Sequence, residues 1–220
     1  MIQIAIKVLT LSNEVYRQLR EKICTGEIPP GERITIRDIA SKFEVSTMPV
    51  REAIRRLQAE GFLQIDKRCA VVRKLSLKEL QEIFVIRKRL ETLAIEWALP
   101  NVKDKDINEL KNILDEFDKE DIDNIEWQRI NRKFHLSIYE LSMSKPLNQL
   151  VKNVWDSVTP YMHIYATSPS SYKFSKRQHS LMIEYIEENK KEQLIKILIN
   201  HLDVTHESIV HNIKNNMDKI

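Results

Sequence analysis

The chain of 220 residues is long enough for one large domain or two modest ones, and its hydrophobic share of 42% is ordinary for a globular protein. With only 3 Gly and 7 Pro, the composition disfavours all-β folds, collagen-like repeats and Gly-rich phosphate-binding loops, and it favours helices. The net charge of +3 divides unevenly: residues 1–74 hold 14 Lys and Arg against 9 Asp and Glu, and the rest hold 21 against 23. A basic first third is typical of a nucleic-acid-binding module.

The first apolar stretch, residues 2–11, is interrupted by Gln3 and Lys7 and lacks a small-residue cleavage site. It therefore predicts neither a signal peptide nor a membrane span. Cys24 and Cys69 have neither metal-ligand spacing nor the density of a disulfide framework. We expect a cytoplasmic protein with no membrane partner.

Two short helices are predicted early in the chain. Residues 12–25 have apolar side chains at helical spacing and end at Gly26, which predicts a supporting first helix. Residues 35–43 open with a Thr-x-x-Asp capping pattern at Thr35 and predict a second helix.

The third predicted helix carries the strongest functional signal. Ser46 can cap its N-terminus, and Pro49 fits a first turn whose amides have no intrahelical partner. One apolar stripe repeats at i, i+4 and i+7, and it is formed by Val50, Ile54 and Leu57. Three basic side chains lie off that stripe: Arg51, Arg55 and Arg56. With a tight turn at residues 44–45 before it, this pattern predicts a helix-turn-helix.

After Gly61 come two β-prone runs, residues 62–65 and 70–72, around a polar turn at residues 66–68. They predict a two-stranded β-wing.

These residues resemble the winged helix-turn-helix of GntR-type bacterial transcription regulators over about residues 12–74. The resemblance is carried by Pro30-Gly31-Glu32, Ile39-Ala40, Val45-Ser46, Pro49-Val50-Arg51-Glu52-Ala53-Ile54, Leu57 and Glu60-Gly61. It implies that the third helix enters the DNA major groove and that the wing tip touches the adjacent minor groove.

The resemblance also implies DNA contacts at particular positions. Arg37 and Arg51 match positions that contact DNA, and the planar Arg fork suits guanine or phosphate. The start of the third helix is where helix-turn-helix proteins usually reach base edges, whereas Arg55 and Arg56 are read as phosphate contacts or plain surface charge. The predicted DNA-binding residues are Arg37, Ser46, Thr47, Met48, Arg51, Arg55 and Arg68. Thr47 stands where an Arg is common and Arg68 where a Gly is common, so the operator sequence is not carried over.

A domain boundary is predicted near residue 74, because Ser76-Leu77-Lys78-Glu79 is a capping box that starts a new helix. Sparse breaks divide residues 76–217 into about six helices. The fold is therefore expected to be mainly α. Residues 1–74 form a winged helix-turn-helix of three helices and a small β-wing, and residues 75–220 form an all-α bundle used for effector binding and dimerisation.

Three histidines of the second part lie on or beside the apolar stripes of their helices, and His179 and His201 are expected to point inward while His135 and Asn131 lie together at the edge of their stripe. His179 and His201 each lie on the apolar stripe of their own helix, and Asn131 precedes His135 by one helical turn. Three imidazoles and an amide oxygen can then converge as ligands for Zn²⁺ or a similar ion. Each histidine also has a plain interpretation as a hydrogen-bonded core residue. His206 and His211 are expected to face solvent or a partner helix.

The stretch from residue 83 through Asn131-Arg132-Lys133-Phe134-His135 to His179 and His201 is similar to the FCD effector-binding domain of the FadR subfamily. The resemblance implies a divalent metal, Zn²⁺ or Ni²⁺, held by Asn131, His135, His179 and His201, with Asn131 where relatives have Asp. It also implies a pocket in which Arg87 pairs with a bound carboxylate, and the further pocket candidates are Tyr139, His163 and Tyr165.

The sequence therefore predicts a homodimeric, ligand-responsive repressor that binds a pseudopalindromic double-stranded operator and senses a small carboxylate, with metal involved in sensing. It is not expected to be an enzyme. Two alternatives stay open: a regulator that binds a larger acyl ligand without metal, and a metal-dependent hydrolase in which Glu184 or Glu207 serves as the base.

Overall fold

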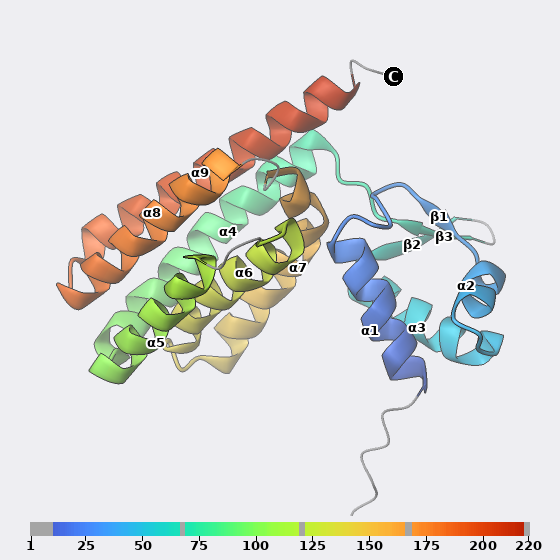
Figure 1. The fold of residues 1–220 in the computed structure, drawn as a ribbon, viewed down its shortest axis with the longest axis horizontal. Helices are drawn as coiled ribbons and strands as arrows, with labels where there is room; N and C mark the ends of the chain where they lie inside the picture. Colours follow the sequence, from blue (N-terminus) through green and yellow to red (C-terminus); the bar gives the residue numbers. More distant parts are fainter. Residues whose placement is uncertain (1–10, 67–68, 119–121, 166–168, 218–220) are drawn as a thin grey trace, which may run out of the picture. The chain divides into compact units, whose positions relative to one another are not determined.

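The computed structural model describes residues 11–66, 69–118, 122–165 and 169–217, and the side chains of all of these except 163–165, 169–171 and 216–217. The chain divides into two compact units, Met1–Leu75 and Ser76–Ile220 (Figure 1).

The first unit has three helices and a small antiparallel sheet. Its elements are α1 (Leu11–Cys24), β1 (Arg33–Ile34), α2 (Ile36–Lys42), α3 (Thr47–Ala59), β2 (Leu63–Asp66) and β3 (Cys69–Val72). The strand order is β1-β3-β2, so the predicted two-stranded wing gains a third strand. The Gly31 amide donates to the Val72 carbonyl (2.8 Å) and holds β1 beside β3. A two-residue strand is too short to produce a period-2 pattern in the sequence.

Packing of α1 against α3 forms the core of this unit, as the apolar stripes predict. The turn between α2 and α3 places Glu44 at φ 53°, and the Val45 amide donates to the Ala40 carbonyl (2.9 Å). Thr35 caps α2 by accepting from the Asp38 amide (3.2 Å). Ser46 is the residue before α3, but its side chain makes no capping hydrogen bond, so that detail of the prediction is wrong.

The second unit is all-helical and, in its described residues, has six α-helices, which confirms the predicted number. Its elements are α4 (Leu77–Ala98), the 3₁₀ turn η1 (Leu99–Asn101), α5 (Asp104–Asp115), the 3₁₀ turn η2 (Glu116–Asp118), α6 (Asn124–Glu140), α7 (Lys145–Tyr165), α8 (Pro169–Glu187) and α9 (Lys191–Met217). Both halves of the Ser76–Glu79 capping box form at the start of α4.

Helix α4 packs against α6, α7 and α9, while α8 packs against α9 and α5 (Figure 1). This arrangement brings α4, α6, α8 and α9 around one interior that contains polar as well as apolar side chains. The buried polar group includes Arg87, Glu91, Asn131, His135, Gln178, His179 and His201. Across the described parts of the chain, the helices lack the length and apolar character that a membrane crossing requires.

Candidate metal centre and nucleic-acid interface

Three histidines from three helices meet inside the second unit. His135 lies on α6, His179 on α8 and His201 on α9, and all three are buried. The Nε2 atom of His135 lies 3.2 Å from that of His201 and 3.1 Å from that of His179. Their ligand atoms all lie within 4.8 Å of one another, a spacing that suits a single cation.

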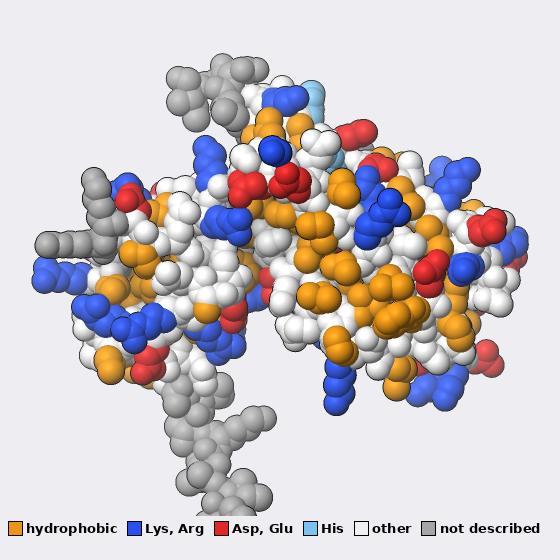
Figure 2. Space-filling view, turned by 180° about the vertical axis from the view of Figure 1, so that it is seen from behind, with side chains coloured by type: hydrophobic (Ala, Val, Ile, Leu, Met, Phe, Trp, Pro, Cys, Tyr) orange, Lys and Arg blue, Asp and Glu red, His pale blue; other side chains and the backbone are white. Residues whose placement is uncertain are grey.

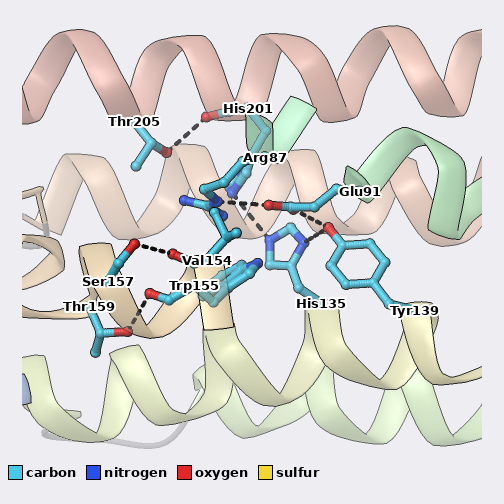
Figure 3. Close-up of polar contacts among 10 residues, drawn as sticks. All are labelled: Arg87, Glu91, His135, Tyr139, Val154, Trp155, Ser157, Thr159, His201 and Thr205. Atoms are coloured by element: carbon cyan, nitrogen blue, oxygen red, sulfur yellow. Dashed lines mark hydrogen bonds and ion pairs between the residues drawn. The ribbon is translucent and has the colours of Figure 1, made fainter. Parts of the chain in front are cut away.

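Neighbouring side chains fix which nitrogen of two of these rings carries the proton, and Figure 3 shows the contact of His135 with Tyr139. His201 Nδ1 donates to Gln178 Oε1 (2.8 Å), whose amide is oriented by donating to Asn200 Oδ1 (2.8 Å). The Tyr139 hydroxyl donates to Glu91 Oε2 (2.5 Å), which leaves its oxygen to accept from His135 Nδ1 (3.2 Å). With both Nδ1 atoms protonated, the Nε2 lone pairs of His135 and His201 face each other, as in metal sites with outer-shell partners.

Burial holds the three imidazoles in their neutral form. It lowers the pKa of His135 and of His179 well below the usual 6.5, with a smaller contribution from the neighbouring His201. Burial, followed by the positive charge of Arg87, lowers the pKa of His201 to about 3. Neutral imidazole is the form that binds a metal ion.

Asn131 is also buried, one turn before His135 on α6. Its Oδ1 atom has no hydrogen-bond partner among the described residues. An unpaired buried acceptor is costly, and such atoms call for an explanation, of which an unseen ion is one. The donor set therefore fits a divalent metal: three imidazole nitrogens and one free amide oxygen.

Arg87, the predicted partner of a bound carboxylate, is buried beside this cluster on α4. Its Nε atom donates to Glu91 Oε1 (2.7 Å), and its guanidinium lies 4.2 Å from the centre of the Trp155 ring (Figure 3). The Nη1 atom is buried and has no hydrogen-bond partner in the described part of the chain. The Nη1 group of this arginine is therefore left to donate to a further acceptor.

The remaining predicted pocket residues are Tyr139, His163 and Tyr165, and the structure describes the side chain of Tyr139. Tyr139 is buried between His135 and Glu91, and its hydroxyl takes part in the contacts described above. His163 and Tyr165 belong to α7, but their side chains lie outside the described residues. The other two histidines were expected to face solvent or a partner helix. His211 is exposed, as expected, whereas His206 is partly buried and packs on Phe84.

The predicted DNA-contacting side chains of the first unit are all exposed where the structure describes them, whereas Arg68 lies outside the described residues. This exposed group consists of Arg37, Ser46, Thr47, Met48, Arg51 and Arg55. Met48 is 65% exposed at the start of α3. Within the described ranges, Arg37, Arg51 and Arg55 make no ion pair, so their charges are available to an external anion.

Arg56 differs from the three arginines just named. Its guanidinium lies 3.6 Å from the centre of the Tyr16 ring, and its Nε atom donates to Glu60 Oε1 (3.1 Å). Tyr16 itself donates to Glu60 Oε2 (2.6 Å), and burial followed by this bond raises the pKa of Tyr16 to about 12. Arg56 thus joins α3 to α1 through Tyr16, a structural contact that the sequence did not predict.

Sequence reasoning missed Glu91, Gln178 and Trp155 as members of the polar interior. Arg87 and Glu91 are spaced i, i+4 on α4, a spacing that could have predicted their ion pair. No sequence pattern identifies Gln178 or Trp155, because both reach the cluster through packing of separate helices.

Residues 11–72 match the model for bacterial regulatory proteins of the gntR family, and residues 82–204 match the FCD domain. The regulator YdhC of Bacillus subtilis (strain 168) is 29% identical over 202 residues, covering 90% of each chain. McbR of Escherichia coli (strain K12) is 28% identical, covering 85% of this chain and 87% of its own. The gluconate operon transcriptional repressor of B. subtilis is 24% identical, covering 89% and 83%.

Solved structures share the fold. E. coli McbR/YncC superimposes with a TM-score of 0.79 at 24% identity, covering 95% of this chain and all of that one. The FCD domain of the regulator TM0439, in its metal-free form, gives a TM-score of 0.56 at 21% identity and covers 64% of this chain and 99% of that one. The matched families and relatives are transcription regulators and not enzymes, as expected. The chain belongs to the GntR family of bacterial transcription regulators and carries the FCD effector domain.

Proposed function

We propose that this regulator is a homodimeric, metal-dependent repressor that releases its operator when a small carboxylate binds the FCD domain. The convergence of one ring nitrogen from each of three buried histidines, all within 4.8 Å of one another, carries the proposal. Repression is supported by the gluconate operon repressor among the relatives. Residues 1–74 would bind DNA and residues 75–220 would sense the effector, in the cytoplasm where the chromosome lies.

In the first unit, α3 would enter the major groove with Ser46, Thr47 and Met48 at the base edges. The free Ser46 hydroxyl and the exposed first turn of α3 support this role. Arg37 and Arg51 would bind guanine or phosphate, and Arg55 a phosphate. These side chains make no ion pair within the described residues, so binding DNA would break no internal contact.

In the second unit, His135, His179, His201 and Asn131 would hold Zn²⁺ or Ni²⁺. When bound, the ion would supply a concentrated positive charge with coordination positions open to a carboxylate. Gln178 and Tyr139 would keep the rings of His201 and His135 in the required tautomers. Arg87, through its unpaired Nη1, would hold the effector carboxylate from a second side.

The sensing groups come from α4, α6, α8 and α9, so a ligand held between them favours one arrangement of these helices over another. Such a preference shifts the population of the bundle and, through it, the spacing of the two DNA-binding units of the dimer. A ligand can shift this equilibrium only as far as its affinity differs between the two arrangements.

The outer face of α4 is the surface we assign to a second copy of the chain. Figure 2 shows hydrophobic side chains gathered over one face of the helical unit, and α4 exposes Val85, Ile86 and Trp97 at 51%, 47% and 47%. Arg89 and Glu96 also lie on this face, in a groove between α4 and α9. They are two turns apart, so a two-fold axis midway between them would pair Arg89 of each copy with Glu96 of the other.

A mobility-shift titration tests the function. An operator is selected from a random pool of double-stranded DNA, and the metal-free protein is titrated with Zn²⁺ and with a panel of small carboxylates. Release of the operator by a carboxylate in the presence of Zn²⁺, but not after EDTA, supports the proposal. Release by a long-chain acyl compound in metal-free protein would favour the acyl-ligand alternative, and no response to any ligand or chelator would overturn the sensing mechanism.

A further inference from the structure

We infer that Asn131 makes the site favour a divalent cation and a carboxylate anion as a pair, so that each binds more tightly in the presence of the other. The inference rests on the proposed metal site and concerns how this particular chain would regulate it.

All four candidate donors are uncharged. Imidazole binds a metal in its neutral form, and the amide oxygen of Asn131 carries no formal charge, unlike the carboxylate that the resemblance to FCD domains leads one to expect there. A cation held by His135, His179, His201 and Asn131 would therefore keep its full charge of +2.

The surroundings do not neutralise that charge. Among the described residues that are buried, Arg87 and Glu91 are the ones with a charged guanidinium and carboxylate, and they form an ion pair. Glu91 is committed on both oxygens, with Oε1 accepting from Arg87 and Oε2 accepting from Tyr139 (Figure 3). The charges of this pair cancel, so the pair adds no net negative charge near a bound cation. The Arg87 guanidinium on the interior side is itself positive and does not offset the charge of the cation.

A dication held only by neutral donors in a buried site lacks the stabilisation that an anionic ligand would add, because a charge of opposite sign offsets much of the cost of desolvating an ion in a low-dielectric interior. An external carboxylate would supply that charge and would also accept from the unpaired Nη1 of Arg87. Each ligand then raises the affinity for the other by the same factor, as linkage requires. The regulator would respond to the coincidence of metal and effector, not to either alone.

The test measures Zn²⁺ affinity of the full-length protein by competition with a chromophoric chelator at fixed ionic strength set with perchlorate. Acetate is the anionic probe, and acetamide is its neutral counterpart of similar shape. For the unaltered protein, we expect acetate to tighten Zn²⁺ binding at least tenfold and acetamide to leave it unchanged. In Asn131→Asp, Zn²⁺ binds more tightly without acetate, and the gain from acetate falls below threefold.

The matched control is Asn153→Asp, which adds the same charge at an exposed position of α7 and should behave like the unaltered protein. Replacement of Zn²⁺ by Co²⁺ in the unaltered protein gives a second readout, since acetate that joins the pair would change the visible absorption of Co²⁺. If the unaltered protein binds Zn²⁺ equally tightly with and without acetate, the inference fails while the metal site stands. If no variant binds Zn²⁺ at all, the metal site of the proposed function fails with it.

Discussion

The two units use their charged and polar side chains in opposite ways. The winged-helix unit leaves Arg37, Arg51 and Arg55 exposed and without ion pairs in the described residues, whereas the FCD unit buries Arg87 and pairs it with Glu91. An exposed, unpaired cation suits a polyanion that approaches from solvent. A buried cluster suits a small ligand that must be enclosed, and only an enclosed ligand can bias the packing of several helices at once.

The largest effect is expected from His179→Ala, which removes a proposed metal ligand. Loss of a single outer partner of a metal ligand typically costs about ten- to a hundredfold in metal affinity, so we expect the loss of the ligand itself to exceed about a hundredfold. Zn²⁺ content after dialysis, measured by elemental analysis, checks this result. His211→Ala, at an exposed position of α9, should keep the metal. Equal metal content in both variants would contradict the buried site.

The variants Arg51→Ala and Arg56→Ala compare two arginines of the winged-helix unit, one without an ion pair in the described residues and one that contacts Tyr16 and Glu60. Loss of Arg51 should weaken operator binding by about 1–3 kcal/mol if it binds a base, measured by fluorescence anisotropy at a fixed salt concentration. Loss of Arg56 should leave DNA affinity nearly unchanged and instead lower the unfolding temperature, because Arg56 stacks on Tyr16. An equal loss of DNA affinity in both variants would show that the contacts of Arg56 with Tyr16 and Glu60 do not distinguish the two arginines.

Acid should destabilise the metal-free FCD unit through its buried histidines. Their pKa is depressed on folding, so the neutral form is favoured in the folded state, and stability falls as pH drops below the unfolded value of 6.5. Between pH 6.5 and 5.5, each such histidine should remove about 1 kcal/mol from the free energy of unfolding. Tryptophan fluorescence during urea unfolding reports on this unit alone, since Trp97, Trp127 and Trp155 all belong to it. His201→Gln should show a correspondingly weaker pH dependence over this interval.

The smallest effect is expected at the proposed dimer surface, where exposed ion pairs are worth about 0.2–1 kcal/mol each. Arg89→Glu alone and Glu96→Arg alone should each weaken the dimer, because the two-fold axis would place like charges together twice. The double variant should restore it, as measured by sedimentation over a range of concentrations. Met143→Glu, at an exposed apolar position outside α4, serves as the control. Failure of the double variant to recover would exclude this pairing of α4 with its copy.

Much of the fold could be predicted because its signals are local. The stripe of Val50, Ile54 and Leu57 and the Ser76–Glu79 capping box depend on residues three or four apart, and the structure forms both. The strand β1 could not be predicted, since two residues carry no periodicity and their pairing partner lies about forty residues away. The capping hydrogen bond predicted for Ser46 does not form, for a related reason. The residue type permits a serine to make this bond but does not force its side chain to make it.

The helix-turn-helix, the new helix that starts the second unit and the inward direction of His179 and His201 could be predicted from the sequence, because they follow from helical periodicity and capping patterns along one segment. Other contacts depend on the packing of separate helices: Arg56 stacks on Tyr16 while Arg51 does not, and Gln178 and Tyr139 orient the facing Nε2 atoms of His201 and His135. These contacts join side chains from different helices. They depend on the angle and depth at which whole helices pack, which a one-dimensional spacing does not contain.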